Sequence, residues 1–263
     1  MGSQADNFWN QAGKVLKHEE LSLDGQGTFS LEPGHIHIWQ FHLPQIQKYL
    51  DDWVAYLCPE ECDRMARFVF ERDRIKYGLS RGGLRQLLGR YVEQDPASLD
   101  FEYEAKGKPH LYLNGKRHPL QFNLSHSGDW VVYGVSCDRP LGIDIEQIRP
   151  LRNLHSLAQH CLTPIECQDL FESVEADHSK FFEYWTSKEA YLKATGQGLT
   201  HSMTNVKADL AAAQILPEPH NPNFDFEWHL HRWVPAVGYT AAVVYPGNSC
   251  TLQHQEYAAL FPP

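Results

Sequence analysis

Two segments of the chain, 105 positions apart, resemble each other, and this internal repeat limits the possible folds more than any other feature of the sequence. Residues 57–62 read Leu-Cys-Pro-Glu-Glu-Cys, and residues 162–167 read Leu-Thr-Pro-Ile-Glu-Cys. In both segments a proline stands where a helix begins, and acidic residues occupy the first turn, where they interact favourably with the helix dipole. The repeat therefore predicts that one kind of helix start occurs twice, in two related parts of the chain.

The sequence around both segments follows the same order of elements. A strand-like run precedes each segment, a long aromatic-rich helical pattern follows it, and each part ends in β-rich sequence. These runs are 36–41, 68–91 and 130–136 in the first part, and 141–146, 181–194 and 239–245 in the second. We therefore predict an α+β fold of two similar halves, 33–139 and 140–263, after an N-terminal extension over 1–32. A cleft between such halves is a natural ligand site.

Composition excludes several classes of protein. The chain has 263 residues, of which 42% are hydrophobic and 21% charged, so disorder, collagen and coiled coil are excluded. No run approaches the ~20 apolar residues of a membrane helix, and the first residues lack the pattern of a signal peptide. The six cysteines form no CxxC pair and the 15 histidines include no HExxH motif, so a zinc site is not expected. We predict a cytoplasmic protein with reduced thiols and no contact with a membrane.

Charge is distributed unevenly along the chain. The net charge is −10, yet residues 64–90 hold eight basic residues against two acidic ones, which leaves this segment at +6. The basic residues are Arg64, Arg67, Arg72, Arg74, Lys76, Arg81, Arg85 and Arg90. Such a concentration indicates a bound anion or an acidic partner, with a solvated helix face as the alternative. The overall acidity argues against nucleic-acid binding, which needs many phosphate contacts.

The predicted strand at 142–146 carries two acidic residues. Alternate residues of a strand share a face, so Ile143 and Ile145 are expected to face the core while Asp144 and Glu146 project together. Their Cα atoms would lie roughly 6.5 Å apart, which lets both carboxylates reach one cation. This segment alone leaves two interpretations open, a cation site and an exposed strand face of an acidic protein.

The predicted helix at 181–193 adds a third carboxylate. Its aromatic residues, Phe181, Phe182 and Trp185, fall on or beside the same stripe as Lys188, Glu189, Leu192 and Lys193. An ordinary ion pair between Glu189 and Lys193 is the simpler interpretation, and it would contribute only tenths of a kcal/mol. The alternative is a carboxylate flanked by two lysines at the edge of the cleft. Three carboxylates with nearby lysines suit Mg²⁺ bound to a phosphorylated substrate.

Two further segments carry polar groups that suit a phosphate. Residues 122–128, Phe-Asn-Leu-Ser-His-Ser-Gly, offer hydroxyls, backbone N–H groups and an imidazole. Residues 106–109, Lys-Gly-Lys-Pro, place two cations at a tight bend. Each segment alone is also consistent with a plain turn. A Ser–His hydrolase pair at Ser125 and His126 is disfavoured, because adjacent residues of an extended chain point apart.

Taken in order, these motifs resemble the 4′-phosphopantetheinyl transferase family, in its larger, monomeric, surfactin-synthetase-activating form. The resemblance covers about residues 36–245, and the acidic strand and the Trp-Lys-Glu-Lys helix are its most specific parts. It implies a pseudo-dimer with the active site in the cleft between the halves. It also implies transfer of the phosphopantetheine arm of coenzyme A to a serine hydroxyl of an acyl or peptidyl carrier protein, with release of 3′,5′-ADP.

The resemblance implies a role for each acidic motif residue. Asp144, Glu146 and Glu189 would hold Mg²⁺, or Mn²⁺, against the coenzyme A pyrophosphate. Glu189 is the best candidate for the base that activates the incoming serine, and whether it is a base, a metal ligand or both is left open. Lys193 would neutralise the charge that builds on the phosphates.

The resemblance also implies contacts to the nucleotide end of coenzyme A. Lys108, Ser125 and His126 would hold this end, with His126 beside the 3′-phosphate, and Arg64 would add a basic contact. The other coenzyme-binding candidates are Lys106, Gly107, Asn123, Asp144, Lys188 and Lys193. The chain has Glu60 and Glu61 where some relatives have lysines, which puts the contacts to the adenosine in doubt.

The expected protein partners are acidic apo carrier proteins. The basic segment 64–90 would speed their encounter, and residues 147–157 would contact them because they follow the acidic strand. Two other functions stay open: a metal-dependent hydrolase that cleaves a pyrophosphate, and a catalytically silent relative that binds a carrier protein or coenzyme A. The intact carboxylates argue against the silent relative, because buried charges cost stability when they have no function.

Overall fold

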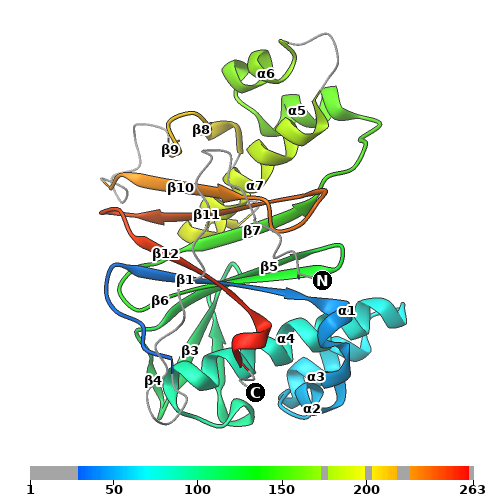
Figure 1. Cartoon of the computed structure of the whole chain (residues 1–263), viewed down its shortest axis with the longest axis vertical. Coiled ribbons are helices and arrows are strands. Elements are labelled where there is room, and N and C mark those ends of the chain that lie inside the picture. The colour runs from blue at the N-terminus through cyan, green and yellow to red at the C-terminus, as the bar shows by residue number, and fades with distance from the viewer. Residues whose placement is uncertain (1–28, 173–176, 199–202, 218–225, 261–263) are drawn as a thin grey trace, which may run out of the picture.

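The computed structural model describes residues 29–172, 177–198, 203–217 and 226–260. Two similar α+β units follow each other along the chain (Figure 1). None of the helices in these ranges is long and apolar enough to span a membrane.

The first unit begins with a strand, continues with four helices and ends with five strands. These elements are β1 (His35–His42), α1 (Leu43–Ile46), α2 (Leu50–Val54), α3 (Pro59–Ala66), α4 (Glu71–Val92), β2 (Asp100–Tyr103), β3 (Pro109–Leu113), β4 (Lys116–Arg117), β5 (Gln121–Ser127) and β6 (Trp130–Ser136). The second unit follows the same plan. Its elements are β7 (Gly142–Gln147), α5 (Leu154–Cys161), α6 (Pro164–Leu170), α7 (His178–Thr195), β8 (Val206–Asp209), β9 (Gln214–Pro217), β10 (Trp228–Trp233) and β11 (Tyr239–Pro246).

The pairing of strands repeats between the two units. In the first, β1 pairs with β6 and β6 with β5, and in the second, β7 pairs with β11 and β11 with β10, all antiparallel. Each unit therefore puts its first strand beside its last strand, with the second-to-last strand outside. This shared topology confirms the prediction of an α+β fold built from two similar halves.

The repeated helix starts lie where the sequence predicts them. Pro164 is the first residue of α6, and Thr163 and Glu166 form a capping box, with the Thr163 N–H donating to Glu166 Oε2 at 2.6 Å. Pro59 is likewise the first residue of α3, and the Cys58 N–H donates to Glu61 Oε2 at 3.2 Å. The same local chemistry therefore starts one helix in each half.

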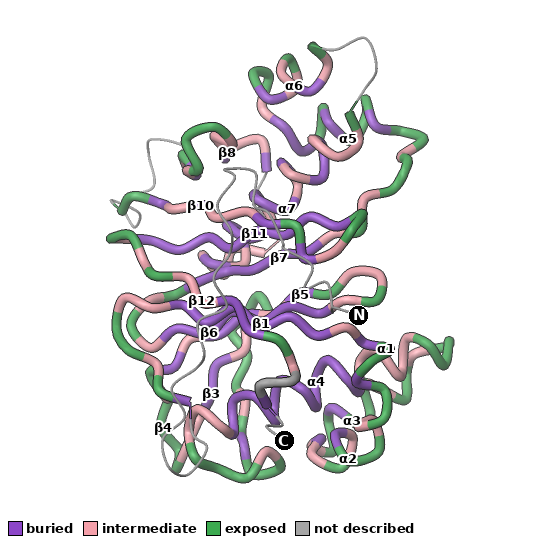
Figure 2. The backbone as a smooth tube through the Cα atoms, in the orientation of Figure 1, coloured by how far each residue is buried: buried purple, intermediate pink, exposed green. Residues whose placement is uncertain are grey.

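A shared core joins the two halves. Ile36 and Ile38 of β1 pack in one cluster with Leu141, Ile143 and Ile145 on the other half, and all five are buried. Separate cores lie under α4 in the first half and under α7 in the second. Buried backbone follows the strands that lie between the two helices (Figure 2). The expectation that Ile143 and Ile145 face the core is confirmed.

The end of the described chain returns to the first half. Strand β12 (Thr251–Glu256) pairs in parallel with β1, and the short helix η5 (Tyr257–Leu260) follows it. Phe29, before β1, is also buried in the first core. The predicted range 140–263 thus includes a strand that completes the sheet β12-β1-β6-β5 of the first half. The boundary near residues 139 and 140 itself stays a prediction.

Candidate active site

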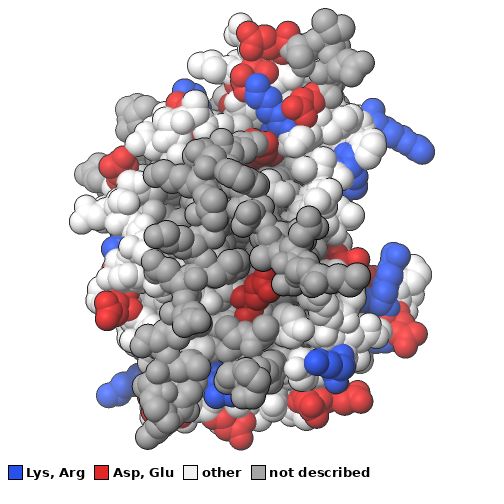
Figure 3. Space-filling view, viewed as in Figure 1, with Lys and Arg blue, Asp and Glu red and all other residues white. Residues whose placement is uncertain are grey.

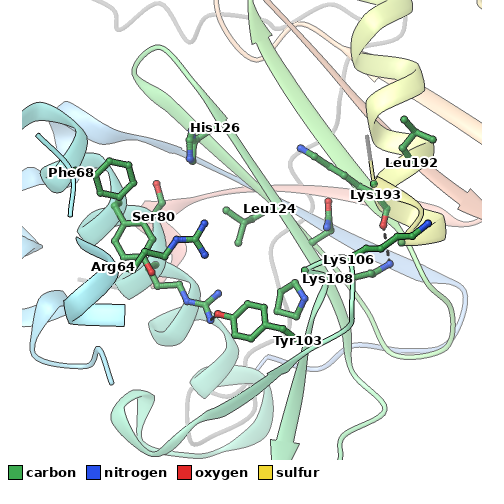
Figure 4. Close-up of a pocket in the computed structure, with 17 residues that line it drawn as sticks. Arg64, Phe68, Ser80, Tyr103, Lys106, Lys108, Leu124, His126, Leu192 and Lys193 are labelled. Atoms are coloured by element: carbon green, nitrogen blue, oxygen red, sulfur yellow. Dashed lines mark hydrogen bonds between the residues drawn. The ribbon is translucent and has the colours of Figure 1, made fainter. Parts of the chain in front are cut away.

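A pocket of about 360 Å³ opens between the halves, and most of the residues predicted to bind the coenzyme lie on its wall (Figure 4). The predicted residues that line it are Arg64, Lys106, Gly107, Lys108, Asn123, His126 and Lys193. They come from α3, from the turn between β2 and β3, from β5 and from α7. The cleft between the halves therefore brings together motifs that are up to 129 positions apart in the sequence.

One end of the pocket combines aromatic rings with arginines. The guanidinium of Arg64 lies 5.8 Å from the centre of the Tyr77 ring, and Arg81 donates to the Tyr103 hydroxyl at 2.6 Å. Phe68 lines the same end. Aromatic faces can stack on a base and guanidinium groups bind phosphate, so this end suits a nucleotide.

Sequence reasoning missed the rings of Phe68, Tyr77 and Tyr103, and it counted Arg81 only as part of the basic segment. The alternation of aromatic and basic residues from position 64 onward was the available signal.

The basic segment 64–90 is not one surface patch. Arg81 and Arg85 are buried, and both donate to the carboxylate of Glu61. Arg72, by contrast, has 81% of its side chain exposed. On the face of the molecule in Figure 3, acidic and basic groups are interspersed rather than gathered by sign. The segment therefore divides its charges among the core, the pocket and the solvent, and its surface charge is smaller than the count of +6.

Residues 122–128 form a strand and its end rather than a turn. Asn123 Oδ1 accepts the Ile143 N–H at 2.9 Å, and the Ser127 hydroxyl oxygen accepts the Gln147 N–H at 3.1 Å. These side chains connect β5 to β7, which belong to different sheets among the described residues. The expected phosphate-binding turn is therefore a polar edge that joins the halves, and sequence alone could not show this because the partner strand lies 20 residues further on.

The same edge holds the two acidic residues of β7. The Ser125 hydroxyl donates to Asp144 Oδ1 at 2.7 Å, and the Ser127 hydroxyl donates to Glu146 Oε2 at 2.8 Å. The Lys193 ammonium also binds Asp144 Oδ1, at 2.7 Å. Two carboxylates of the second half are thus fixed by hydroxyls of the first half and by a lysine of α7.

The carboxylates of Asp144, Glu146 and Glu189 lie close enough for their charges to repel one another. Burial, together with the nearby Asp144 and Glu146, raises the pKa of Glu189 to about 7. Burial and Asp144 also raise the pKa of Glu146. Among the described residues, Asp144 Oδ2 and Glu189 Oε1 are buried without a hydrogen-bond partner. Buried carboxylate oxygens without partners are costly, so this cluster is suited to a cation.

The donor set fits Mg²⁺ shared with a phosphorylated substrate. Within the described ranges, no three Asp, Glu, His or Cys side chains already enclose a metal position. Mg²⁺ does not require such a cage, because it keeps several waters and usually takes one or two protein carboxylates together with substrate phosphates. The unpartnered oxygens of Asp144 and Glu189 supply hard ligands of the kind it prefers.

His126 lines the pocket from β5. Burial, with added effects from the cations Lys76 and Lys193, lowers the pKa of its imidazole. A phosphate dianion beside the ring would raise this pKa again, because an opposite charge favours the protonated form.

The expected coenzyme contact of Lys188 is wrong. Its side chain is completely buried, and its ammonium donates to the carbonyls of Cys161 and Met203 and to Glu166 Oε2, at 2.9, 3.0 and 2.5 Å. Three acceptors use all three ammonium protons. Neighbouring residues of a helix point about 100° apart, so Glu189 lies near Asp144 and Lys193, whose charges act on its pKa, while Lys188 faces the core of the second half.

Comparison with known sequences also divides the chain into two matched parts. Residues 42–137 match the N-terminal domain profile of 4′-phosphopantetheinyl transferases, and residues 140–244 match the profile of the 4′-phosphopantetheinyl transferase superfamily. The chain belongs to the 4′-phosphopantetheinyl transferase family. It is an enzyme that transfers 4′-phosphopantetheine to carrier proteins.

Individual relatives share most of their length with the chain. The 4′-phosphopantetheinyl transferase HetI of Nostoc sp. is 37% identical, over 84% of this chain and 91% of its own length. A putative 4′-phosphopantetheinyl transferase of Synechocystis sp. is 34% identical, over 71% of this chain and 76% of its own length. The 4′-phosphopantetheinyl transferase Sfp of Bacillus subtilis is 27% identical, over 68% of this chain and 80% of its own length. The resemblance predicted from the motifs is thereby confirmed.

Proposed function

We propose that the donor in this transfer is coenzyme A, held with Mg²⁺ in the cleft between the halves, and that the acceptor is a serine hydroxyl of an acidic apo carrier protein. One observation carries the proposal. The carboxylates of Asp144 and Glu189, each with a buried unpartnered oxygen, lie near Lys193, and Lys193 lines a pocket whose wall is aromatic and cationic.

The nucleotide end of coenzyme A would occupy the aromatic end of the pocket. Arg64 and His126, which line the pocket, would bind the 3′-phosphate there, and Lys106 lies across the pocket from them. The rings of Tyr77 and Tyr103 would contact the adenine. In this arrangement the pyrophosphate would lie near Lys193, whose ammonium binds the Asp144 carboxylate.

The reaction is a displacement at phosphorus. The serine oxygen forms a bond to the phosphorus that carries the pantetheine, and the bond from that phosphorus to the bridging oxygen breaks. The electron pair leaves with 3′,5′-ADP, and the serine proton passes to a base. Catalysis of this kind depends on positioning and on compensation of negative charge.

The protein's groups can meet both requirements. Glu189, with a pKa of about 7 and a free oxygen, can accept the serine proton at neutral pH. Lys193 would compensate charge on the phosphates. Bound Mg²⁺ would supply Lewis-acid stabilisation of the phosphate oxygens. When Glu189 acts as the base, Asp144 and Glu146 would hold the metal, because a carboxylate bound to Mg²⁺ would not keep a raised pKa.

The carrier protein would contact residues 147–157. This segment follows Glu146 directly, and it carries the exposed cation Arg149, whose side chain is 57% exposed. Arg152 is also exposed. Exposed arginines beside the acidic cluster would attract an acidic carrier protein without contacting the coenzyme.

Intact-mass spectrometry tests the proposal. An apo carrier protein is incubated with the enzyme, coenzyme A and Mg²⁺, with EDTA in a parallel sample. We expect a mass gain of one phosphopantetheine group, lost with EDTA and with Glu189→Gln but kept with Glu256→Gln, a matched change at an exposed residue of β12. A full mass gain in EDTA would contradict the metal assignment, and loss of coenzyme A without any carrier protein would indicate a hydrolase.

A further inference from the structure

Lys108 belongs to the first half, yet its ammonium group lies at the end of a helix of the second half. The side chain starts just before β3, and Nζ donates to the carbonyl oxygens of Ala194 at 2.8 Å, Lys193 at 3.0 Å and Leu141 at 3.4 Å. Two of these carbonyls belong to the last turn of α7, and the third precedes β7. The Lys108 side chain therefore connects the β2–β3 hairpin of the first half to β7 and α7, the two elements that carry the acidic residues.

These contacts leave Lys108 without a proton for another acceptor. A lysine ammonium has three donors, and three carbonyls occupy them. A cation is also favourable at this position, because the C-terminal end of a helix carries partial negative charge. Burial lowers the pKa of Lys108 to about 8, so at neutral pH the amine is mainly protonated. The residue lines the pocket with its stem, while its charge serves the helix end.

The end of α7 is closely enclosed by both halves. Gly196 ends the helix with a φ of +67°, and a Cβ atom there would lie 3.0 Å from Glu104 Oε2 of the hairpin. On the opposite side, a Cβ atom at Gly142 of β7 would lie 2.0 Å from the Ala190 carbonyl oxygen. The last turns of α7 therefore have little freedom to shift between β7 and the hairpin.

The last turn of α7, which Lys108 binds, also contacts the acidic cluster. Lys193 offers its carbonyl to Lys108, and its own ammonium binds Asp144 Oδ1 at 2.7 Å and the Ile143 carbonyl at 3.2 Å. Glu189 lies one turn earlier on the same helix. A shift of this turn would move the ammonium and the carboxylate relative to a pocket that is built mainly by the first half.

We propose that Lys108 is a positioning residue, which fixes the last turn of α7 and through it Lys193 and Glu189, and that its ammonium does not bind the nucleotide. The inference rests on the proposed roles of Lys193 and Glu189. It replaces the nucleotide contact that the Gly-Lys-Pro motif suggests for this residue.

Two variants in the same turn separate positioning from binding. Lys108→Gln is expected to lower kcat about 10- to 100-fold, because small misplacements of reacting groups are costly, while the Kd for 3′,5′-ADP stays within about twofold. Lys106→Gln is expected to do the reverse, raising this Kd with a smaller effect on kcat. Lys108→Arg, which keeps the charge, should recover part of kcat. A weakened affinity for 3′,5′-ADP with normal kcat in Lys108→Gln would overturn the proposal.

A measurement on the unaltered enzyme covers the case in which Lys108→Gln does not fold. Acetylation of lysines is followed by peptide mass spectrometry with and without 3′,5′-ADP. Lys108 should react slowly and equally in both samples, whereas Lys106 should be protected by the nucleotide. Protection of Lys108 by the nucleotide would contradict its assignment. Normal turnover by Glu189→Gln would instead contradict the proposed catalytic site, whatever the labelling of Lys108 shows.

Discussion

The two halves of the enzyme share the same backbone topology and differ in the side chains at equivalent positions. Glu61 and Glu166, 105 positions apart, both cap the start of a helix and both bind cations of the next long helix. In the first half the cations are Arg81 and Arg85, and in the second the cation is Lys188. This buried pairing is what the two halves share.

Equivalent positions on the first strand of each half carry side chains of different chemistry. Trp39 and Phe41 of β1 belong to the first core, whereas the residues 105 positions later are Asp144 and Glu146. In the first half this strand face packs in the core, and in the second half it carries the carboxylates that we propose hold the metal. Because the carboxylates occur once, one cleft rather than two carries the acidic cluster.

A second pair of equivalent positions carries a cation in the first half and a carboxylate in the second. Arg64 lines the pocket of about 360 Å³ proposed to bind coenzyme A, and 105 positions later Asp169 lines a pocket of about 800 Å³ in the second half. There Asp169 binds Lys180 at 2.8 Å and the Tyr184 hydroxyl at 2.5 Å. The larger pocket also pairs Glu183 with Arg232.

In the smaller pocket Lys193 and Arg81 are paired as well, with Asp144 and Glu61, and Arg64 lies against the Tyr77 ring. The proposed anion site is the smaller of these two pockets.

The largest expected effect concerns the carboxylates that only the second half supplies. Asp144→Ala and Glu189→Gln should each lower the rate of transfer by about a thousandfold, since general-base and charge-stabilising groups contribute at this level. Carrier-protein mass spectrometry measures the rate, and circular dichroism checks that each variant is folded. Near-normal turnover of either folded variant would remove that residue from the proposed site.

The next effect concerns the pairing that the halves share. Lys188→Met leaves Glu166 buried without its cation and should lower the free energy of unfolding by about 3–5 kcal/mol. Urea titration measures this loss, with Lys207→Met, at a partly exposed residue, as the control. If Lys188→Met lowered the free energy of unfolding no more than the control does, Glu166 would stabilise the protein only as a helix cap.

The exchange of one residue tests why only one pocket takes an anion. Arg64→Asp gives the first half the residue of the second, and it should weaken binding of 3′,5′-ADP about 10- to 100-fold through the loss of a charge-assisted contact. Asp169→Arg should leave the stoichiometry at one nucleotide per chain. Isothermal titration calorimetry measures both values, and a second bound nucleotide in Asp169→Arg would show that this position alone decides the difference.

The smallest expected effect is the pH dependence of stability. Folding raises the pKa of Glu189 from 4.5 to about 7. Between these two pH values the carboxyl is therefore protonated in the folded state and ionised in the unfolded state. Stability therefore falls across this window as pH rises. Glu189→Gln, which cannot ionise, should have a higher Tm than the unaltered enzyme at pH 8 and little difference at pH 4.5. Equal Tm differences at both pH values would exclude this titration.

The sequence predicts best what is decided locally. Pro59 and Pro164 begin helices because proline and a following glutamate satisfy the first turn by themselves. Strand alternation likewise places Asp144 and Glu146 apart from Ile143 and Ile145. These features need no knowledge of distant residues, and the structure agrees with them.

The features that could not be predicted depend on distant partners. Both sides of α7 are buried, so periodicity could not decide that Lys188 faces the core and Glu189 the acidic cluster. The serines of β5 acquire their function from β7, and Lys108 from the end of α7. Strand β12 has no strong apolar alternation, and it pairs with a strand more than 200 positions earlier in the sequence.

This last pairing has a consequence for the order of events during synthesis. The first half emerges from the ribosome before the second, but the strand that covers the outer edge of β1 is made only after β7 to β11 of the second half. Until then β1 presents unpaired backbone groups at an edge, which is a known route to wrong association. We expect the sheet of the first half to stay incomplete until β12 has been translated, so that its folding is coupled to the synthesis of the second half.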